Sequence, residues 1–493
     1  MSKSYFLKLF LFLMMFSPSF AASAAFGGKT AAKCSVKPSS STGYYVFRTI
    51  QDAIDASYCS KIVVQSGTYY ENLQIKRDVT ITGSSSSATI IDGSSAGRVV
   101  QIASKLNVTL NTLTIQNGYA WAESAFDGGG ILSYGYLTLN NVDFTSNVAN
   151  RGGAIYQYGG SLKVSSSSFT DNTAGSGAVI YATKSDIIVQ KSEFTENDGT
   201  YGAVIYGTSN TDVAVSESSF TEGTSSFGGA FYLYDGGDFS MEDSQCENNE
   251  VTGGGGCIFA VELDSITLTS TEIDGNKATG SGNGGGGIYA RDVTSLSVDA
   301  STIAENSTGY LGGGIFSDGT ESVSILNSTF SSNSADSSGG ALYLIDGTVS
   351  IVQSTIYQNT AVSSGGGLSQ RLSDTTITLS IISDNEATGA SYYDDCSISG
   401  VFTSSGDNLF GDTSCWDETG DVVGEDVKLG ALQDNGGSTK THMPDADSPA
   451  VEGGGRTCSD DYDQRGAARP YDGDSYSYEY CDIGAVEYGS PVS

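Results

Sequence analysis

Acidic side chains are the most numerous groups in this sequence that could carry out chemistry. Asp and Glu number 57, against 23 Lys and Arg and a single His, and the formal net charge is −34. Two carboxylates that flank a glycosidic bond can hydrolyse it, one as general acid and the other as nucleophile or base. Here the carboxylates are so many and so dispersed that spacing singles out no pair. The runs at 393–395 and 460–463 are typical of solvated loops, and we assign no catalytic residue.

The only histidine, His442, lies in the stretch 441–444 with no Cys and no triad partner beside it. Triad chemistry requires a positioned partner, and zinc sites require Cys or His at short spacings. We therefore expect His442 to be a surface or cap residue. No metal ligand and no cofactor is assigned, and calcium has no supporting motif in this acidic chain.

The charge balance decides which partners can be expected. A net charge of −34 is typical of solubility in an extracellular medium, with cation binding as the alternative. The few Lys and Arg residues share no common position, so no basic groove for an anionic polymer is predicted. Nucleic acid is excluded as a partner for the same reason.

Aromatic residues recur at intervals of about 25 to 30 residues and are the best candidates for ligand contact. They are Tyr156, Tyr181, Tyr206, Tyr232, Phe259, Tyr289, Phe316 and Tyr343. If they line the outside of the molecule as a stripe, their faces could grip flat sugar rings or a partner protein. The alternative is that the rings only stabilise one another across neighbouring strands.

These rings belong to a phrase of about 26 residues that recurs along residues 128–385. Each copy has an apolar residue three positions before an Asn, except that Gly223 replaces one Asn, and small residues then precede an Ile, Leu or Phe. The apolar positions are Phe144, Phe169, Phe194, Phe220, Cys246, Ile273, Ile303, Phe330, Ile356 and Ile382; the Asn positions are Asn147, Asn172, Asn197, Asn249, Asn276, Asn306, Asn333, Asn359 and Asn385. A period of this length indicates a solenoid.

The composition of the repeat predicts strands rather than helices. Its Ser, Thr, Gly and Asn residues are interleaved with Val, Ile and Tyr, and 161–164, 295–298 and 375–379 alternate apolar and polar residues. Two or three short strands fit in one repeat. Stacked coils would pair each strand in parallel with its equivalent, at about 4.8 Å.

Stacking predicts continuous files of equivalent side chains. The Phe and Ile positions should fill the interior, and each Asn amide should bond the Asn above and below it at a bend. Asn also tolerates a left-handed backbone there. The pair Gly339-Gly340 and its equivalents should supply a positive φ or a close backbone approach at the next corner.

The first 24 residues read as a secretory signal peptide. Lys3 and Lys8 precede the apolar run 9–16, and 22–24 is a small-x-small cleavage site. No later stretch approaches 18 consecutive apolar residues, so no transmembrane segment is expected in the mature chain. We expect a secreted, extracellular or cell-surface location.

Eight cysteines in an exported chain favour disulfides. The residues are Cys34, Cys59, Cys246, Cys257, Cys396, Cys415, Cys458 and Cys481. Pairing of nearest neighbours is the simplest of the 105 connectivities that eight cysteines allow.

The two ends of the array have their own patterns. Residues 46–57 carry Ile50, Ala53 and Ile54 at helical spacing, which predicts a short amphipathic helix over the open end of the stack. We expect an N-terminal cap with irregular coils over 25–118, regular repeats over 119–390 and a C-terminal cap over 391–493.

The stretches TIQDAI, IVVQSGTYYENLQI, VTITG and TIIDG between residues 49 and 93 resemble the N-terminal part of β-helix proteins of the pectin-lyase-like superfamily. The phrase FxxN…GGA(I/L)Y over 128–385 is similar to the repeats of polymorphic outer-membrane proteins. Both resemblances imply a right-handed parallel β-helix on an exported protein. Together with the patterns at the two ends, the expected fold is all-β: a right-handed single-stranded parallel β-helix with a short N-terminal capping helix and a disulfide-stapled C-terminal cap. The first also implies polysaccharide chemistry, by a Lys or Arg base with Ca²⁺ or by paired carboxylates.

The C-terminal stretch 429–488 resembles the choice-of-anchor Q domain of bacterial surface proteins. The matching residues are Leu432, Asn435–Gly437, Ser448–Ala450, Asp463–Gly466, Arg469, Asp482–Ala485 and Glu487. We expect Arg465 and Arg469 to form an ion-pair network with Asp463 and Asp482 that holds the cap.

Because no site emerges from the sequence, the favoured interpretation is a secreted or cell-surface structural, adhesion-type protein. Its extended surface would contact extracellular glycans or surface and matrix proteins. The alternative is an extracellular polysaccharide lyase or glycoside hydrolase. A flat, evenly decorated rod would favour the first, and carboxylates converging beside a Lys or Arg would favour the second.

Overall fold

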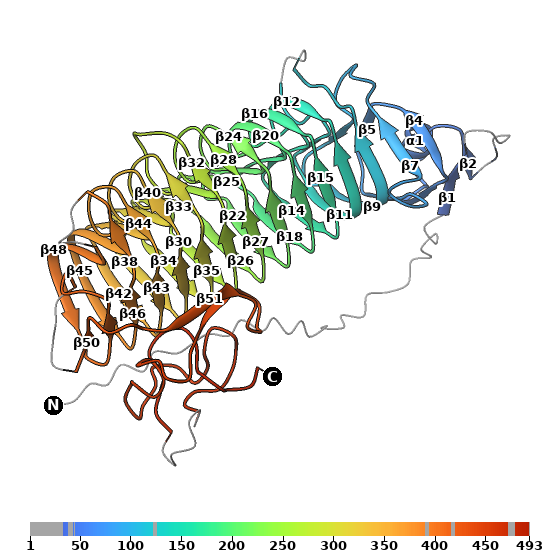
Figure 1. Ribbon diagram of the computed structural model, residues 1–493. Helices are drawn as coiled ribbons and strands as arrows, with labels where there is room; N and C mark the ends of the chain where they lie inside the picture. Colours follow the sequence, from blue (N-terminus) through green and yellow to red (C-terminus); the bar gives the residue numbers. More distant parts are fainter. Residues whose placement is uncertain are drawn as a thin grey trace, which may run out of the picture.

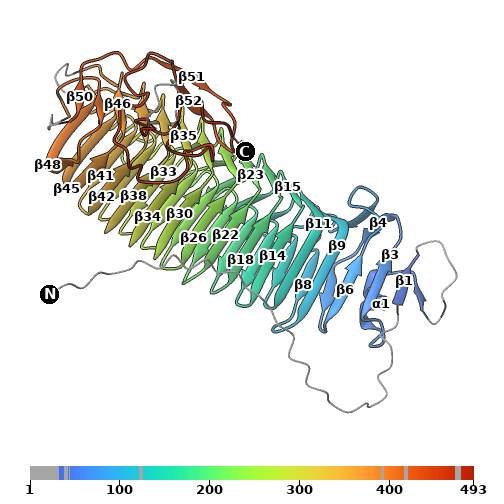
Figure 2. The same ribbon diagram turned by 90° about the horizontal axis from the view of Figure 1, so that it is seen from below.

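The computed structural model describes residues 33–37, 43, 45–121, 126–389, 394–415, 420–471 and 479–492. The predicted signal peptide lies outside these ranges. Figure 1 shows a long rod of stacked coils, with the N-terminal coils in blue, the last coils in orange and the C-terminal residues in red along one side. The view from below in Figure 2 shows the same red segment lying over the coils.

Each regular coil contributes a strand to each of four faces of the rod. The ring face, which carries the aromatic residues, consists of β10 (Ile131–Ser133), β13 (Ile155–Tyr158), β17 (Ile180–Thr183), β21 (Ile205–Thr208), β25 (Phe231–Tyr234), β29 (Ile258–Val261), β33 (Ile288–Arg291), β37 (Ile315–Asp318), β41 (Leu342–Ile345) and the start of β45 (Leu368–Thr378). The middle face consists of β14 (Ser161–Ser165), β18 (Asp186–Gln190), β22 (Asp212–Ser216), β26 (Asp238–Glu242), β30 (Ser265–Thr269), β34 (Ser295–Asp299), β38 (Ser322–Leu326) and β42 (Thr348–Val352).

The third face, called the flank face below, carries the Phe and Ile positions of the repeat. It consists of β15 (Ser168–Thr170), β19 (Glu193–Thr195), β23 (Ser219–Thr221), β27 (Gln245–Glu247), β31 (Glu272–Asp274), β35 (Thr302–Ala304), β39 (Thr329–Ser331), β43 (Thr355–Tyr357) and β46 (Ile381–Ser383). The fourth face is a separate parallel sheet of β12 (Val148–Arg151), β16 (Thr173–Ser176), β20 (Asp198–Tyr201), β24 (Thr224–Ser225), β28 (Glu250–Val251), β32 (Lys277–Ala278), β36 (Ser307–Thr308), β40 (Ser334–Ala335), β44 (Thr360–Ala361) and β47 (Glu386–Ala387).

The strands of the regular coils pair in parallel and in register, so the predicted files of side chains exist. Phe144 pairs with Phe169, and Phe169 with Phe194. Their rings stack at centroid distances of 4.9 and 4.8 Å in the interior. Phe330, Ile356 and their equivalents are fully buried. The core is therefore one apolar column that runs the length of the rod.

The Asn residues form the predicted ladder. Asn306 Nδ2 donates to Asn333 Oδ1 at 3.0 Å, and Asn333 Nδ2 donates to Asn359 Oδ1 at 2.9 Å. The same oxygens accept the backbone N–H of the Asn one coil earlier. At the exception, the backbone N–H of Gly223 donates to Asn249 Oδ1. The amides are buried and satisfied, which is the condition for a stabilising polar file.

The left-handed residue at this bend is not the Asn, as the sequence analysis expected, but the residue before it. Ser332 has φ 56° and Asp384 has φ 55°, whereas no Asn of the ladder has a positive φ. The Asn must point its amide along the ladder, so the preceding residue turns the chain. At the next corner Gly339 has φ 71°, and a Cβ on Gly340 would lie 2.2 Å from the Gly366 carbonyl oxygen, as predicted for this Gly pair.

A second ladder, made of serines at the corner before the flank face, was not predicted. Ser192 Oγ accepts the N–H of Ser167, and Ser218 Oγ accepts the N–H of Ser192. Each hydroxyl donates in turn to the carbonyl two residues earlier, as Ser192 does to Gln190. These serines are buried, so two polar files fix the two ends of each flank strand.

The Asn ladder ends on a carboxylate whose ionisation should make stability pH-dependent. Asp395 Oδ1 accepts Asn385 Nδ2 at 2.8 Å, and burial, with neighbouring Asp412 adding to the effect, raises the pKa of Asp395 to about 7. The folded protein then keeps a proton that the unfolded chain loses near pH 4. Stability should fall as pH rises from 4 to 7, by about 2 kcal/mol between pH 5 and 7. Thermal unfolding of D395N should lack that part of the slope; an unchanged slope would contradict the assignment.

The N-terminal end of the stack is irregular. It comprises β1 (Lys33–Val36), β2 (Val46–Phe47), α1 (Ile50–Asp55), β3 (Lys61–Val64), β4 (Gly67–Tyr70), β5 (Leu73–Ile75), β6 (Val79–Thr82), β7 (Thr89–Asp92), β8 (Val100–Ile102), β9 (Asn107–Gln116) and β11 (Tyr136–Thr145). Helix α1 is capped by Thr49 and buries Ile50, Ala53 and Ile54. It lies at the N-terminal end in Figure 1, as predicted, although it is shorter than the stretch 46–57. No helix among the described residues has the length and hydrophobicity to cross a bilayer.

The C-terminal residues divide into two parts. The strands β48 (Cys396–Ser404), β49 (Leu409–Phe410) and β50 (Val422–Val423) form the last coil, and β51 (Leu429–Gln433) and β52 (Thr441–Pro444) form an antiparallel pair beside the rod. Residues 427–471 and 479–492, together called the C-terminal segment below, run back along the flank face (Figure 1). We expected the whole of 391–493 to cap the end, but only the first part does so.

Four disulfides join the nearest-neighbour cysteines, as expected. They are Cys34–Cys59, Cys246–Cys257, Cys396–Cys415 and Cys458–Cys481. The first lies at the N-terminal end of the core and the third in the last coil. The fourth ties two stretches of the C-terminal segment together. These three bridges stabilise the two ends of the rod and the segment that covers its flank, whereas Cys246–Cys257 closes a bend between β27 and β29 in a middle coil.

Candidate functional site

The outward residues of the flank face divide the rod into an uncovered and a covered part. In β15, β19, β23 and β27 the interior residue alone is buried, and the outward Ser, Thr, Gln and Glu side chains are exposed or half-buried. In β35, β39, β43 and β46 all three residues are buried. The C-terminal segment causes this change, because it lies over the second group of strands.

The covered part shows how this face holds an extended polypeptide. Thr302 Oγ1 donates to the carbonyl oxygen of Lys440, and Thr355 Oγ1 accepts the N–H of Ala485 at 3.0 Å. The Gln464 side chain accepts from Thr329 Oγ1 at 2.6 Å and donates to Thr302 Oγ1 at 2.8 Å. Hydroxyls on successive coils thus serve as donors and acceptors for main-chain and amide groups that lie along the rod.

A lysine is seated at the boundary between the two parts. Lys440 Nζ lies 2.7 Å from Asp274 Oδ2 and 3.8 Å from Glu272 Oε2, and the Lys440 N–H donates to Glu272 Oε1. Although partial burial opposes the charge, the contact with Asp274 raises the pKa of Lys440. Burial, with Asp274 adding to it, raises the pKa of nearby Glu247. Three carboxylates therefore surround one ammonium group.

His442, expected at the surface or in a cap, is instead buried between the segment and the flank face. Its Nδ1 lies 2.7 Å from the Gly430 carbonyl oxygen and its Nε2 lies 2.9 Å from Ser331 Oγ. Burial lowers the pKa of His442, so the neutral ring donates from Nδ1 to the carbonyl and accepts the Ser331 hydroxyl at Nε2. The ring also meets Tyr357 edge to face. These contacts give His442 a structural role in docking the segment.

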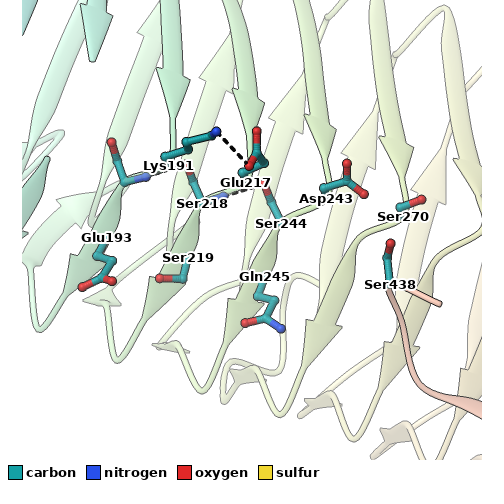
Figure 3. Close-up of a pocket in the computed structure, with 11 residues that line it drawn as sticks. Lys191, Glu193, Glu217, Ser218, Ser219, Asp243, Ser244, Gln245, Ser270 and Ser438 are labelled. Atoms are coloured by element: carbon teal, nitrogen blue, oxygen red, sulfur yellow. Dashed lines mark hydrogen bonds and ion pairs between the residues drawn. The ribbon is translucent and has the colours of Figure 1, made fainter. Parts of the chain in front are cut away.

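The uncovered part ends in a groove of about 670 Å³ against the tip of the β51–β52 hairpin. Figure 3 shows Glu193, Glu217 and Asp243 spread along successive coils, with Ser438 closing the far end. The one cation in the lining, Lys191, lies 3.4 Å from Glu217, and both side chains are more than half exposed. Three carboxylates against this one ammonium group leave the groove with a net negative charge.

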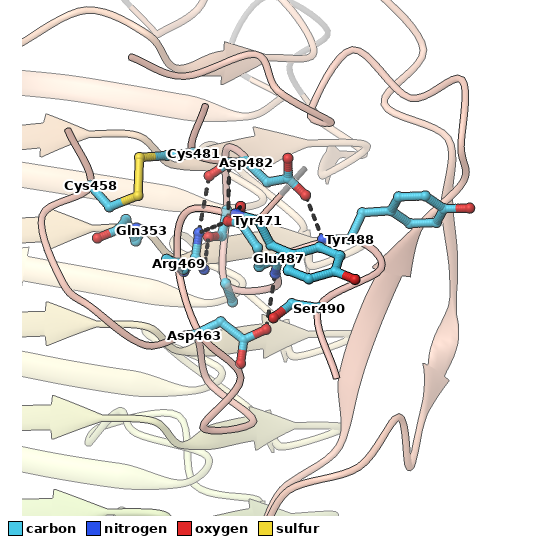
Figure 4. Close-up of polar contacts among 12 residues, drawn as sticks. Gln353, Cys458, Asp463, Arg469, Tyr471, Cys481, Asp482, Glu487, Tyr488 and Ser490 are labelled. Carbon is cyan, nitrogen blue, oxygen red and sulfur yellow. Dashed lines mark hydrogen bonds and ion pairs between the residues drawn. A yellow bond between two sulfur atoms is a disulfide. The ribbon is translucent and has the colours of Figure 1, made fainter. Parts of the chain in front are cut away.

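A buried ion-pair network gives the C-terminal segment its shape. Arg465 donates to Asp463 Oδ2 from Nε at 2.9 Å and from Nη2 at 2.7 Å. Arg469 Nη1 lies 3.3 Å from Glu487 Oε2, and Nη2 donates to the Gly484 carbonyl (Figure 4). The network was expected around Asp482, but that residue offers Arg469 its carbonyl, while its carboxylate accepts the N–H groups of Glu452 and Tyr488. Burial raises the pKa of Asp482.

The tyrosines proposed as ligand contacts form a continuous stack on the ring face but not an exposed stripe. Tyr156 and Tyr289 are buried and Tyr181, Tyr206, Tyr232 and Tyr343 are half-buried. Neighbouring rings lie nearly parallel at 4.4 to 5.9 Å. The faces of the inner rings are therefore occupied by one another. A ligand-contact role remains a prediction that only ring edges and hydroxyls could fulfil.

The sequence reasoning missed the flank face, the groove and the seat of Lys440. One signal was available: the outward positions of the repeat change from Ser, Thr and Glu to Ala304, Tyr357 and Ile381 in the later coils. Apolar residues at outward positions indicate a covered surface.

A family model described as "Right handed beta helix region" matches residues 98–273 and 180–360, which together span more than half of the chain. The chain belongs to the right-handed β-helix family. The handedness expected from the sequence is thereby confirmed, while the resemblance of 429–488 to the choice-of-anchor Q domain stays a prediction because it lies beyond the match. No curated protein matches the chain.

Several solved structures are distantly similar to the chain. A pectin methylesterase in complex with hexasaccharide VII is 15% identical, with 45% of this chain and 80% of that chain covered and a TM-score of 0.28. Pectin methylesterase from carrot is 12% identical over 62% and 85%, with a TM-score of 0.26. The A-module of the Azotobacter vinelandii mannuronan C-5 epimerase AlgE6 is 13% identical over 76% and 94%, with a TM-score of 0.27. At these scores we transfer no activity to this β-helix protein.

Proposed function

We propose that this chain is a secreted or cell-surface structural, adhesion-type β-helix protein. Its uncovered flank face, β15 to β27 with the adjoining groove, would contact extracellular glycans or surface and matrix proteins. The observation that carries the proposal is the division of the flank face. The same file of outward side chains that binds the C-terminal segment in later coils continues in the earlier ones, where no described part of that segment covers it.

The geometry of the uncovered face suits an elongated partner. Hydroxyl, amide and carboxylate groups repeat once per coil, at about 4.8 Å, along Ser168, Glu193, Ser219 and Gln245. The rigid core below fixes their positions, so binding costs little ordering of the protein. The four disulfides and the predicted signal peptide support an extracellular location.

A polysaccharide-active enzyme is the second candidate, and one observation favours it. Glu247, Glu272 and Asp274 converge beside Lys440, and the raised pKa of Glu247 is a property that a general acid needs. However, Asp274 is paired with Lys440, and Glu272 accepts the Lys440 N–H as part of the docking of the C-terminal segment. The cluster is therefore used structurally, and we favour the binding protein.

The test is an array of glycans and extracellular matrix proteins probed with the full secreted chain. A T195R/T221R variant places two long charged side chains on the uncovered face and should weaken binding at least tenfold. The matched S240R/T267R variant carries the same change on the middle face and should bind as the wild type does. Equal binding by all three proteins would overturn the proposal. Cleavage of any array polysaccharide that is lost in E247Q would establish the enzyme instead.

A further inference from the structure

The contacts of Lys440 show which chemical groups the flank face can bind. The C-terminal segment contributes main-chain N–H and C=O groups to Glu272 and Thr302, and its ammonium group to Asp274. Since the pKa of Lys440 is raised, the charged form is the bound form. The face thus recognises an extended polypeptide through its backbone and a lysine together.

Carboxylate, amide and hydroxyl groups like those that contact Lys440 also line the groove. The outward positions that adjoin Glu272 are Gln245, Ser219 and Glu193 on successive coils, and Glu247 adjoins Asp274 in the second outward file. Glu217 and Asp243 line the groove at the corner before these strands. Against three carboxylates in the groove there is one lysine, so the formal charge is 1 − 3 = −2. Glu193, Glu217 and Asp243 are all exposed.

We propose that the groove and the uncovered flank face dock an extended, lysine-bearing polypeptide segment of a partner protein. The proposal rests on the adhesion-type function above and specifies its partner. Three observations support it. The groove is continuous with a surface that already holds a polypeptide, and its charge complements lysine. Ser219 of the groove also lies in the same outward file as Thr302 and Thr355, which bind main-chain groups in the covered part. Basic polymers of amino sugars share the amine but not the peptide groups.

The direction of the docked segment suggests how the partner would lie. Lys440 contacts β31, whereas His442 contacts β39 and Tyr357 of β43, so the segment runs along the rod axis from one coil to the next. A partner segment in the groove would follow the same axis on the other side of Ser438. Its lysines would lie beside Glu193, Asp243 and Glu247.

The experiment uses the full chain and a fluorescent ten-residue peptide of alternating Lys and Thr, with binding followed by anisotropy at low and physiological salt. The test variant is E193Q/D243N, which removes two groove charges. The control variant is D186N/D212N, which removes two exposed charges at the start of middle-face strands. A Glu-Thr peptide and a glucosamine oligomer are the comparison probes.

We expect E193Q/D243N to weaken binding of the Lys-Thr peptide at least tenfold and D186N/D212N to change it less than twofold. The Glu-Thr peptide should not bind. Equal weakening by both variants would show attraction to net charge alone and would overturn the docking site, as would absence of Lys-Thr binding. The docking site would also be overturned if the glucosamine oligomer bound, E193Q/D243N weakened that binding, and the Lys-Thr peptide did not bind. In each case the array result with T195R/T221R still decides the adhesion-type function independently.

Discussion

Replacement of Arg469 by Met should detach the C-terminal segment from the flank face while the coils stay folded. The Arg469 side chain is fully buried, pairs with Glu487 at 3.3 Å and donates to the carbonyls of Asp482 and Gly484. Met fills a similar volume but leaves the Glu487 carboxylate buried without its cation. Breaking one side of a buried ion pair costs about 3–5 kcal/mol, which is a large part of what a segment of this size can contribute.

The effect should be local, because the segment packs on the coils through a small apolar cluster that is separate from the main core. The main core runs through the coils, whereas Val427, Ala450 and Ile483 of the segment pack in a smaller cluster with Leu409, Ile381 and Tyr357. Hydrogen exchange should show loss of protection over 427–492 and over the outward contacts of β35 to β46, with protection in β17 to β30 unchanged. Proteolysis should remove the segment first.

The matched control is Arg151→Met. Arg151 also pairs with a carboxylate, Asp127, at 2.7 Å, and its own side chain is 41% exposed while that of Asp127 is 8% exposed. The pair joins the first regular coils and makes no contact with the described part of the C-terminal segment, so any loss of stability should be local to those coils and the segment should stay docked. If R469M and R151M unfold alike, or if R469M unfolds the coils together with the segment, then the network does not act as the local support that we infer.

The parts of the fold that could be predicted are those that follow from the spacing of residues in the repeat. A side chain that returns at the same place in every coil meets its own equivalent, so the Phe file, the Asn ladder and the Gly corners follow from spacing alone. The capping helix follows from Ile50, Ala53 and Ile54. The disulfides followed from sequence proximity, because their partners are only 11 to 25 residues apart.

The candidate site could not be predicted, because it depends on contacts that the repeat does not encode. Lys440 meets Asp274 across 166 residues, and Gln464 meets Thr302 across 162. The period of the repeat does not indicate that the chain turns back along the flank face after the last coil. The rings show the stacking that the sequence analysis gave as the alternative to ligand contact. Their degree of burial could not be predicted, because alternation along a strand placed them outside, whereas the stacking of rings and neighbouring loop residues such as Phe227 and Leu311 cover most of their surface.

Truncation of the interior file should be the most damaging single change within the coils. Phe194 is fully buried and its ring lies between those of Phe169 and Phe220 at 4.8 and 4.7 Å. Phe194→Ala removes both stacking contacts and leaves a cavity that the neighbouring coils cannot fill, since the backbone above and below is held by the Asn and Ser ladders. Such substitutions cost about 3–5 kcal/mol. Denaturant unfolding of the full chain should show this loss as an early transition of the coils around β19.

The repeat itself supplies the control for this prediction. Ile occupies the same position in Ile273 and Ile303, so Phe194→Ile should keep most of the packing and cost less than about 1.5 kcal/mol. Thr195→Ala, on the outward side of the same strand, should cost less than about 1 kcal/mol because it removes only a half-buried hydroxyl. In a solenoid each coil is supported only by its neighbours, so a cavity at Phe194 weakens the stack where the uncovered flank face lies. Equal stability of the Ala and Ile variants would mean that packing in this file does not limit the stability of the rod.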